Sequence, residues 1–233
     1  MPIWLSDKLF QKKLLFNELK RHDDNFDDIN KIYFSEHHFS HAASAFYPSP
    51  FKKAIILTLD GVGEWATTTV AQGSENNLNI LKEIHFPHSV GLLYSAFTFY
   101  TGFKVLSGEY KVMGLAPYGE AKFEKKILDN LIDLKDDGTF KLNMDYFDYA
   151  AGLKMTNNKF SNLFGEPVRK SNAKLTQFHM DVAASIQAVT NKIVLRLVRS
   201  IAKDYSNENL CMAGGVALNC VTNGEIINEK IFK

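Results

Sequence analysis

Three residues in the first third of the chain have the types and spacing of a metal-binding site. His37 and His41 lie four residues apart in EHHFSHAASAF, so on a helix both imidazoles would project from one face. Such a pair can present two nitrogen ligands to one metal ion. Asp60 follows AIILTL, a predicted buried strand, and strand ends are where α/β sheets place chemistry. A lone HxxxH is more often an ordinary helix face, and the nearby carboxylate is what favours a metal.

Two glycine-containing turns predict places where the backbone could meet a phosphate. The first directly follows Asp60, and its glycines would let the chain turn tightly without a side chain in the way. The second lies between a predicted strand, Asn209–Met212, and a helix predicted to open at the second turn, an arrangement common at nucleotide sites. Glycine in such turns also serves packing alone. We expect one cleft to lie between the two turns, Gly61-Val62-Gly63 and Gly214-Gly215-Val216.

The elements predicted around the histidines are a strand, a helix and three further strands. Pro48 and Pro50 close the helix, since proline cannot continue its hydrogen-bond ladder. The strands after the helix are rich in β-formers and separated by turn residues, which predicts an antiparallel run. The predicted strands are Lys31–Phe34, Ala54–Leu59, Glu64–Gln72 and Leu78–Phe86.

The second half of the chain is predicted to contain several helices. The apolar run HSVGLLYSAFTFYTGFK predicts a buried helix. SGEYKVMGLAPYGEAKF carries three glycines and a proline, which predicts an irregular loop that packs against the core. Apolar residues recur every three or four positions over Leu175–Tyr205, which predicts a long helix with one buried face. His179 and Asp181 near its start are interpreted as capping and surface groups.

The N-terminal segment is predicted to be an amphipathic helix rather than a targeting signal. It carries charges throughout and lacks the apolar core and cleavage site of a signal peptide. The helix should run from about Asp7 to Arg21. Its buried side would consist of Leu9, Leu14, Phe16 and Leu19.

The composition argues against several classes of partner. A net charge of +1 over 233 residues provides no electrostatic attraction for nucleic acid or for an anionic membrane. No stretch approaches the roughly 18 uninterrupted apolar residues of a membrane span. Cys211 and Cys220 offer no disulfide framework, so a cytoplasmic location is expected.

Four segments together resemble the nodulation-protein and cephalosporin type carbamoyltransferases. They follow one another in the expected order between about Tyr33 and Asn228: HHFSHAASAFYPSPFKKAIILTLDGVGEWATT, GEYKVMGLAPYG, FHMDVAASIQAVTNKIV and MAGGVALNCVTNGEI. More distant relatives with the HxxxH core are the tRNA threonylcarbamoyl-adenosine synthases and the hydrogenase-maturation carbamoyltransferases. The resemblance implies an α/β fold of the actin-like ATPase type, shared with sugar kinases and Hsp70, and incomplete here at both ends.

The resemblance also implies a reaction. Such enzymes form a carbamoyl-adenylate from carbamoyl phosphate and ATP and pass the carbamoyl group to a hydroxyl of a small acceptor. A divalent metal, iron in this group, would be held by His37, His41 and Asp60 and would offset charge on phosphate oxygens. Lys111 would contact phosphate, and no catalytic residue is assigned. The nucleotide and its phosphates would meet Gly61, Val62, Gly63, Gly214, Gly215, Val216 and Asn219.

The resemblance departs from the family pattern at both ends of the chain. Members begin with a strand and a His-Asp-Ser-Ser type loop that contacts carbamoyl phosphate, and they continue to a further metal aspartate and a C-terminal domain. The chain is therefore expected to be an internal fragment, inactive alone, whose partners include missing parts encoded by neighbouring frames. Its expected divisions are a metal-binding part at about 31–90, an insertion at 91–174 and a nucleotide-binding part at 175–233.

Two alternatives stay open from the sequence. One is a relative of the tRNA threonylcarbamoyl transferases, which the neutral charge and the GEYKVMGLAPYG segment disfavour because a tRNA partner favours a basic face. The other is a truncated product that binds nucleotide without catalysis. The identity of the acceptor hydroxyl is expected to depend on regions outside this stretch.

Overall fold

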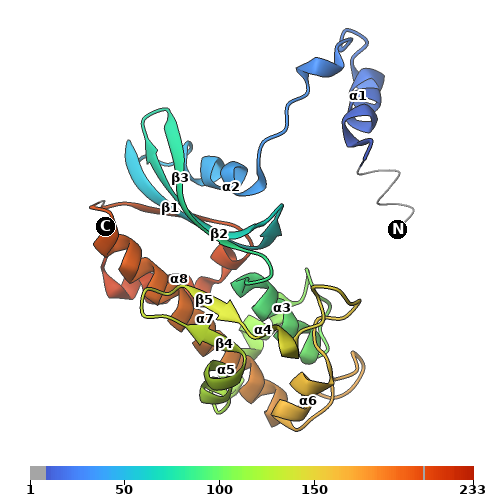
Figure 1. Ribbon diagram of the computed structural model, residues 1–233, viewed down its shortest axis with the longest axis vertical. Helices are drawn as coiled ribbons and strands as arrows, with labels where there is room; N and C mark the ends of the chain where they lie inside the picture. Colours follow the sequence, from blue (N-terminus) through green and yellow to red (C-terminus); the bar gives the residue numbers. More distant parts are fainter. Residues whose placement is uncertain (1–8, 207) are drawn as a thin grey trace. The chain divides into compact units, whose positions relative to one another are not determined.

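The computed structural model describes residues 9–206 and 208–233 (Figure 1). The chain divides into two compact units, and the boundary falls between Glu36 and His37. All predicted site residues belong to the larger unit. Its main sheet contains parallel and antiparallel pairs and packs against helices, so the predicted α/β class is confirmed. The division at 31–90, 91–174 and 175–233 stays a prediction.

The smaller unit contains the helix α1 (Gln11–His22). The prediction that one side of this helix is buried is wrong, because α1 has no buried residue and Leu14 is 46% exposed. Within the described part of this unit, the aromatic contact of α1 is that of Phe16 with Phe26, too little surface to form a core. Asp7, the predicted start of the helix, lies outside the described residues.

The strand predicted at Lys31–Phe34 is also wrong. Lys31 ends a short 3₁₀ helix, η2 (Ile29–Lys31), and the residues after it are in no strand. Tyr33 is 88% exposed. Residues with a high β propensity form a strand only where a partner strand and a packed face are available, and neither is present here.

The main sheet of the larger unit has the strand order β3-β2-β1-β6. β1 (Lys53–Gly63), β2 (Ala66–Ser74) and β3 (Asn77–His85) form the predicted antiparallel run. β6 (Leu210–Ala213) pairs with the other edge of β1 in parallel, and the last pair of that ladder is Thr58 with Ala213. Asp60 therefore lies two residues beyond the point where β1 and β6 stop pairing.

Helices cover both faces of this sheet (Figure 1). α2 (His37–Phe46) packs on one face, and α3 (Val90–Tyr100) packs on the other together with α7 (Gln177–Asp204). Successive side chains of β1 alternate between the two layers, since Ile56 belongs to the α2 side and Leu57 to the larger core. β1 is thus buried on both faces, which explains its continuous apolar sequence.

The loop predicted around Lys111 is instead helical. It forms α4 (Glu109–Leu115), followed by the 3₁₀ helix η3 (Ala116–Tyr118). The glycines did not prevent helix formation because Gly108 precedes the first turn and Gly114 lies near the end. The predicted packing is confirmed, since Val112 and Leu115 are buried in the larger core.

The long helix α7 is confirmed, with its predicted face buried. The capping role of His179 is also confirmed, but the predicted surface position of His179 and Asp181 is wrong. His179 is buried and forms a capping box with Thr176. Asp181 is 4% exposed and accepts hydrogen bonds from Lys122 Nζ and from the backbone N–H of Glu120, both at 2.9 Å. These partners lie about 60 residues away in the chain, so no local pattern indicates that the carboxylate is buried.

The remaining elements complete the larger unit. None of the helices in the described part of the chain combines the length and apolar character needed to cross a bilayer. The elements not yet given are α5 (Glu124–Asn130), β4 (Ile132–Leu134), β5 (Phe140–Leu142), η4 (Met144–Tyr146), α6 (Asn158–Phe164), η5 (Val216–Leu218) and α8 (Cys220–Glu229).

Candidate metal centre

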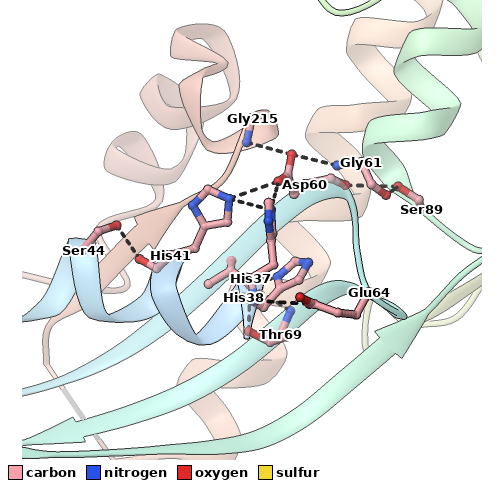
Figure 2. A network of polar contacts seen from close by, with 11 residues as sticks. His37, His38, His41, Ser44, Asp60, Gly61, Glu64, Thr69, Ser89 and Gly215 are labelled. Carbon is pink, nitrogen blue, oxygen red and sulfur yellow. Dashed lines mark hydrogen bonds and ion pairs between the residues drawn. The ribbon is translucent and has the colours of Figure 1, made fainter. Parts of the chain in front are cut away.

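The side chains of His37, His41 and Asp60 converge on one point (Figure 2). His37 and His41 project from the same face of α2, and Asp60 extends toward them from β1. His37 Nε2 lies 2.7 Å from Asp60 Oδ2, and His41 Nε2 lies 3.0 Å from the same oxygen. The two Nε2 atoms are 3.0 Å apart. The convergence expected from the spacing is therefore present, and metal binding by the three side chains stays a prediction.

The position of α2 depends on contacts at its first residue. The backbone N–H of His37 donates to Glu64 Oε2 at 3.1 Å, so a side chain from the β1–β2 turn satisfies one free donor of the helix. β1 passes directly beneath the His37 ring, and a Cβ on Gly63 would overlap that ring. Glycine at this position thus allows the strand and the histidine to approach closely.

The carboxylate of Asp60 is oriented by backbone donors. Its Oδ1 accepts hydrogen bonds from the N–H of Gly61 at 2.8 Å and of Gly215 at 3.2 Å, which leaves Oδ2 directed at the histidines. Burial raises the pKa of Asp60, but hydrogen bonds from His37, the Gly61 N–H, His41 and the Gly215 N–H outweigh it and lower the pKa to about 2. The group is therefore an anion at neutral pH.

The three ligand atoms form a donor set suited to a divalent cation. Ligands bonded at about 2.1 Å and at right angles to one another lie about 3.0 Å apart, close to the separations of these atoms. Without a cation, two imidazole N–H groups that both point at Asp60 Oδ2 would also point at each other, which is unfavourable because both are donors. Two histidines and one carboxylate on a common face, with the remaining positions open, are typical of a non-haem iron site.

His38 supports the site without belonging to it. Its side chain is turned away from the His37 and His41 face and is buried. His38 Nδ1 and Thr58 Oγ1 lie 2.6 Å apart, and Thr58 Oγ1 is 2.7 Å from Thr69 Oγ1, so the ring links α2 to β1 and β2. Burial and the neighbouring His37 lower the pKa of His38, which keeps the ring neutral.

Two supporting residues escaped the sequence prediction. One is Glu64, for which the sequence offers no signal because its partner is a helix 27 residues upstream. The other is Ser89, the N-cap of α3, whose Oγ donates to the carbonyl of Gly61 at 2.6 Å and accepts from the Leu92 N–H at 3.0 Å. A serine just before an apolar helical run is a recognisable capping signal, so this residue could have been found.

The tight turn predicted at Gly61-Val62-Gly63 is wrong. These three residues are the last part of β1, and the chain turns at Glu64, which has a φ of 47°. The second glycine turn does bend sharply, since Gly214 has a φ of 98° and a Cβ there would overlap the carbonyl of Leu59. The two segments meet at Asp60, where each contributes one N–H.

The other predicted nucleotide residues occupy defined structural positions. Val216 begins η5, and the α-helix predicted to open at the glycines starts at Cys220 instead. Asn219 is the N-cap of α8, and its Oδ1 accepts from the Thr222 N–H at 3.1 Å. Lys111 is exposed on α4, and no hydrogen bond or ion pair among the described residues joins it to the side chains of His37, His41 and Asp60. Nucleotide contacts by these residues stay predictions.

The structure defines an α/β protein with a cluster of two histidines and one carboxylate that could hold a metal ion. Comparison with known sequences identifies the family. Residues 1–233 match the family model described as the carbamoyltransferase N-terminus. The chain therefore belongs to this family, and the resemblance found in its motifs is confirmed.

The relatives include nodulation proteins. The chain is 34% identical over its whole length to the nodulation protein NolNO of Sinorhizobium fredii and 33% identical over 84% of its length to NolO of Bradyrhizobium diazoefficiens. It is 60% identical over its whole length to an uncharacterized protein of Synechocystis. It covers 32%, 34% and 38% of these proteins, respectively, and thus spans about a third of their length.

Proposed function

We propose that this chain is the metal- and nucleotide-binding part of an O-carbamoyltransferase with an actin-like ATPase fold. The complete enzyme would hydrolyse carbamoyl phosphate to carbamate and inorganic phosphate, and the carbamate oxygen would attack the α-phosphorus of ATP to give a carbamoyl-adenylate and pyrophosphate. The hydroxyl of a small molecule would then take the carbamoyl group, losing its proton and releasing AMP. The observation that carries the proposal is the convergence of His37, His41 and Asp60 within a family of carbamoyltransferases. The mixed sheet is compatible with the proposed fold.

His37, His41 and Asp60 would hold a divalent ion, with iron the expected metal. When bound, the ion would supply positive charge that stabilises phosphate oxygens. The chain itself prepares the site, because two backbone N–H groups hold Asp60 Oδ1 and the carboxylate stays ionised. His37 is 41% exposed and Asp60 22%, so the cluster lies at an open surface that a phosphate can approach.

Binding of a metal to the purified chain tests the proposal. Titration with Fe²⁺ under anaerobic conditions, or with Co²⁺ followed by its visible absorption, should detect one ion per chain. His41→Ala and Asp60→Asn should weaken binding by more than the roughly 10–100-fold typical of supporting residues, because each removes a ligand. Mutation of His85 to Ala is the matched control, since this histidine is exposed on β3 and pairs with Glu83.

Equal metal affinity in wild type, His41→Ala and His85→Ala would contradict the assigned ligands. A second measurement tests the reaction class. The full-length Synechocystis relative should release pyrophosphate from ATP in the presence of carbamoyl phosphate, and the change equivalent to Asp60→Asn should abolish this release. The 233-residue chain alone should release no pyrophosphate. Catalytic groups that act as a unit lose their activity when some of them are absent.

A further inference from the structure

Gln187, a side chain of α7 with 5% exposure, forms hydrogen bonds with α3 and with the N-cap residue of α8. The N-terminal end of α3 contacts Asp60, and so does the segment that leads into α8. Tyr94 on α3 donates its hydroxyl to Gln187 Oε1 at 3.0 Å. Asn219 at the start of α8 donates its Nδ2 to the same oxygen at 3.0 Å, and Gln187 Nε2 donates to Asn219 Oδ1 at 3.1 Å. The two amides therefore form a reciprocal pair in which each donates to the other.

The hydrogen bonds among Gln187, Tyr94 and Asn219 form a network, and Asn219 connects this network to the carboxylate of Asp60. The segment from Gly214 to Asn219 is closed by its own hydrogen bonds, which include Leu218 N–H to the Gly215 carbonyl and Asn219 N–H to the Val216 carbonyl. These bonds connect Gly215 to Asn219 within one short, internally bonded segment. The Gly215 N–H within it donates to Asp60 Oδ1, so the amide pair at Asn219 fixes the far end of the segment that supplies this donor.

The Tyr94 side leads to the backbone of Asp60. Tyr94 lies on α3, whose N-cap Ser89 donates its hydroxyl to the carbonyls of Asp60 and Gly61. A Cβ on Gly91 would lie 2.5 Å from the Asp60 carbonyl oxygen, so the first turn of α3 is in direct contact with this strand end. Gln187 thus links both structures that hold Asp60, one through its backbone and one through its side chain.

We propose that Gln187 is a positioning residue of the metal centre, which keeps Asp60 Oδ2 directed at the two histidines. This inference rests on the proposed function. The hydrogen bonds of Gln187 within the described part of the chain go to Tyr94, Asn191, Asn219 and Thr222, and not to the three side chains of the candidate metal centre. An apolar residue of the same length would remove the acceptor that Tyr94 Oη and Asn219 Nδ2 share inside the protein, and unpaired buried groups favour rearrangement.

The test compares Gln187→Met with Thr190→Val, two changes at buried polar residues less than one turn apart on α7. Thr190 is the matched control because its hydroxyl donates only to the Ile186 carbonyl of the same helix, at 2.8 Å, among the described residues. Gln187→Met should raise the Kd for Co²⁺ about 10-fold, the lower end of the range for groups that orient ligands. Thr190→Val should leave the Kd unchanged.

Hydrogen exchange provides a readout that does not need the metal. In Gln187→Met the Gly215 amide should exchange faster relative to the Leu57 amide in the centre of β1, because only the first depends on the network. Equal acceleration of both amides would indicate a general loss of stability and would overturn the proposal, as would an unchanged Kd for Co²⁺.

The positioning role can still be tested if the wild-type chain binds no metal or if Gln187→Met does not fold. If the wild-type chain binds no metal, the proposed function loses its metal site, and the exchange of the Gly215 amide alone decides the positioning role. If Gln187→Met does not fold, Gln187→Glu replaces it, since a glutamate keeps an acceptor for Tyr94 but loses the donor to Asn219. The same selective acceleration at Gly215 is then expected, and its absence overturns the proposal.

Discussion

Two glycine segments meet at Asp60, and they use the same residue type for different physical reasons. In β1, Gly63 lies in extended backbone and is small so that the His37 ring can pass over it. In the segment after β6, Gly214 adopts a φ of 98° and touches the backbone of Leu59. Each segment then supplies one N–H to Asp60 Oδ1. A glycine pattern in a sequence thus indicates close approach or an unusual φ, but not which of the two.

The largest effect is expected at Gly214. Gly214→Ala combines the cost of a positive φ, about 1–2 kcal/mol, with an overlap against the Leu59 carbonyl, so it should lower the free energy of unfolding by about 3 kcal/mol or more. Gly224→Ala is the control, because this glycine lies within α8 with open space around it and alanine should stabilise the helix by about 0.5–1 kcal/mol. Urea denaturation measures both. A loss at Gly214 no larger than 1 kcal/mol would contradict the strain argument.

The next largest effect on stability is expected from the carboxylate of Asp60, which accepts a hydrogen bond from each glycine segment. The pKa of Asp60 is about 2 in the folded chain and 3.8 in its ordinary state, so ionised Asp60 stabilises the metal-free fold. The contribution, about 2 kcal/mol, should be complete above pH 4 and should disappear as the pH falls from 4 to 2. The difference in unfolding free energy between wild type and Asp60→Asn, measured with a chelator present, should show this pH dependence. A difference that stays constant from pH 6 to pH 2 would show that the hydrogen bonds from His37, the Gly61 N–H, His41 and the Gly215 N–H do not favour the anion.

The smallest expected effect is a difference in metal affinity between substitutions at Gly61 and at Gly63, the two glycines near the end of β1. Gly63→Ala should displace the His37 ring and weaken Co²⁺ binding about 10-fold, with a modest change in stability. Gly61→Ala should change the affinity little, because its Cβ would meet Leu92 at an ordinary 3.9 Å. Isothermal titration of the two variants side by side measures the comparison. Similar losses in both would show that the close approach of Gly63 to the His37 ring is not what sets the affinity.

Local patterns in the sequence predicted the elements that carry the ligands. The four-residue spacing placed His37 and His41 on one face of α2, and the apolar run before Asp60 predicted β1. The periodic apolar residues predicted α7. These signals succeed because each depends on residues within one helix or strand, where backbone geometry alone decides which side chains share a face.

Predictions failed where the deciding partner was distant or missing. Asp181 was interpreted as a surface group, but Lys122 and the Glu120 backbone cover it. The apolar side of α1 is exposed because the described residues of its unit offer little to pack against. A carboxylate or a leucine has no fixed burial of its own, and the balance between desolvation and new contacts is settled only when the partners are in place.

The sequence by itself indicated the family and the three side chains that converge, since both depend on residue types and short spacings. Only the tertiary structure decided how Asp60 is held, because the Gly215 N–H comes from 155 residues away and reaches it through the parallel pairing of β1 with β6. The same holds for the amide pair of Gln187 with Asn219, which joins helices that have no local relation in the chain. Periodicity describes one element at a time, whereas a hydrogen bond between elements depends on how the whole core packs.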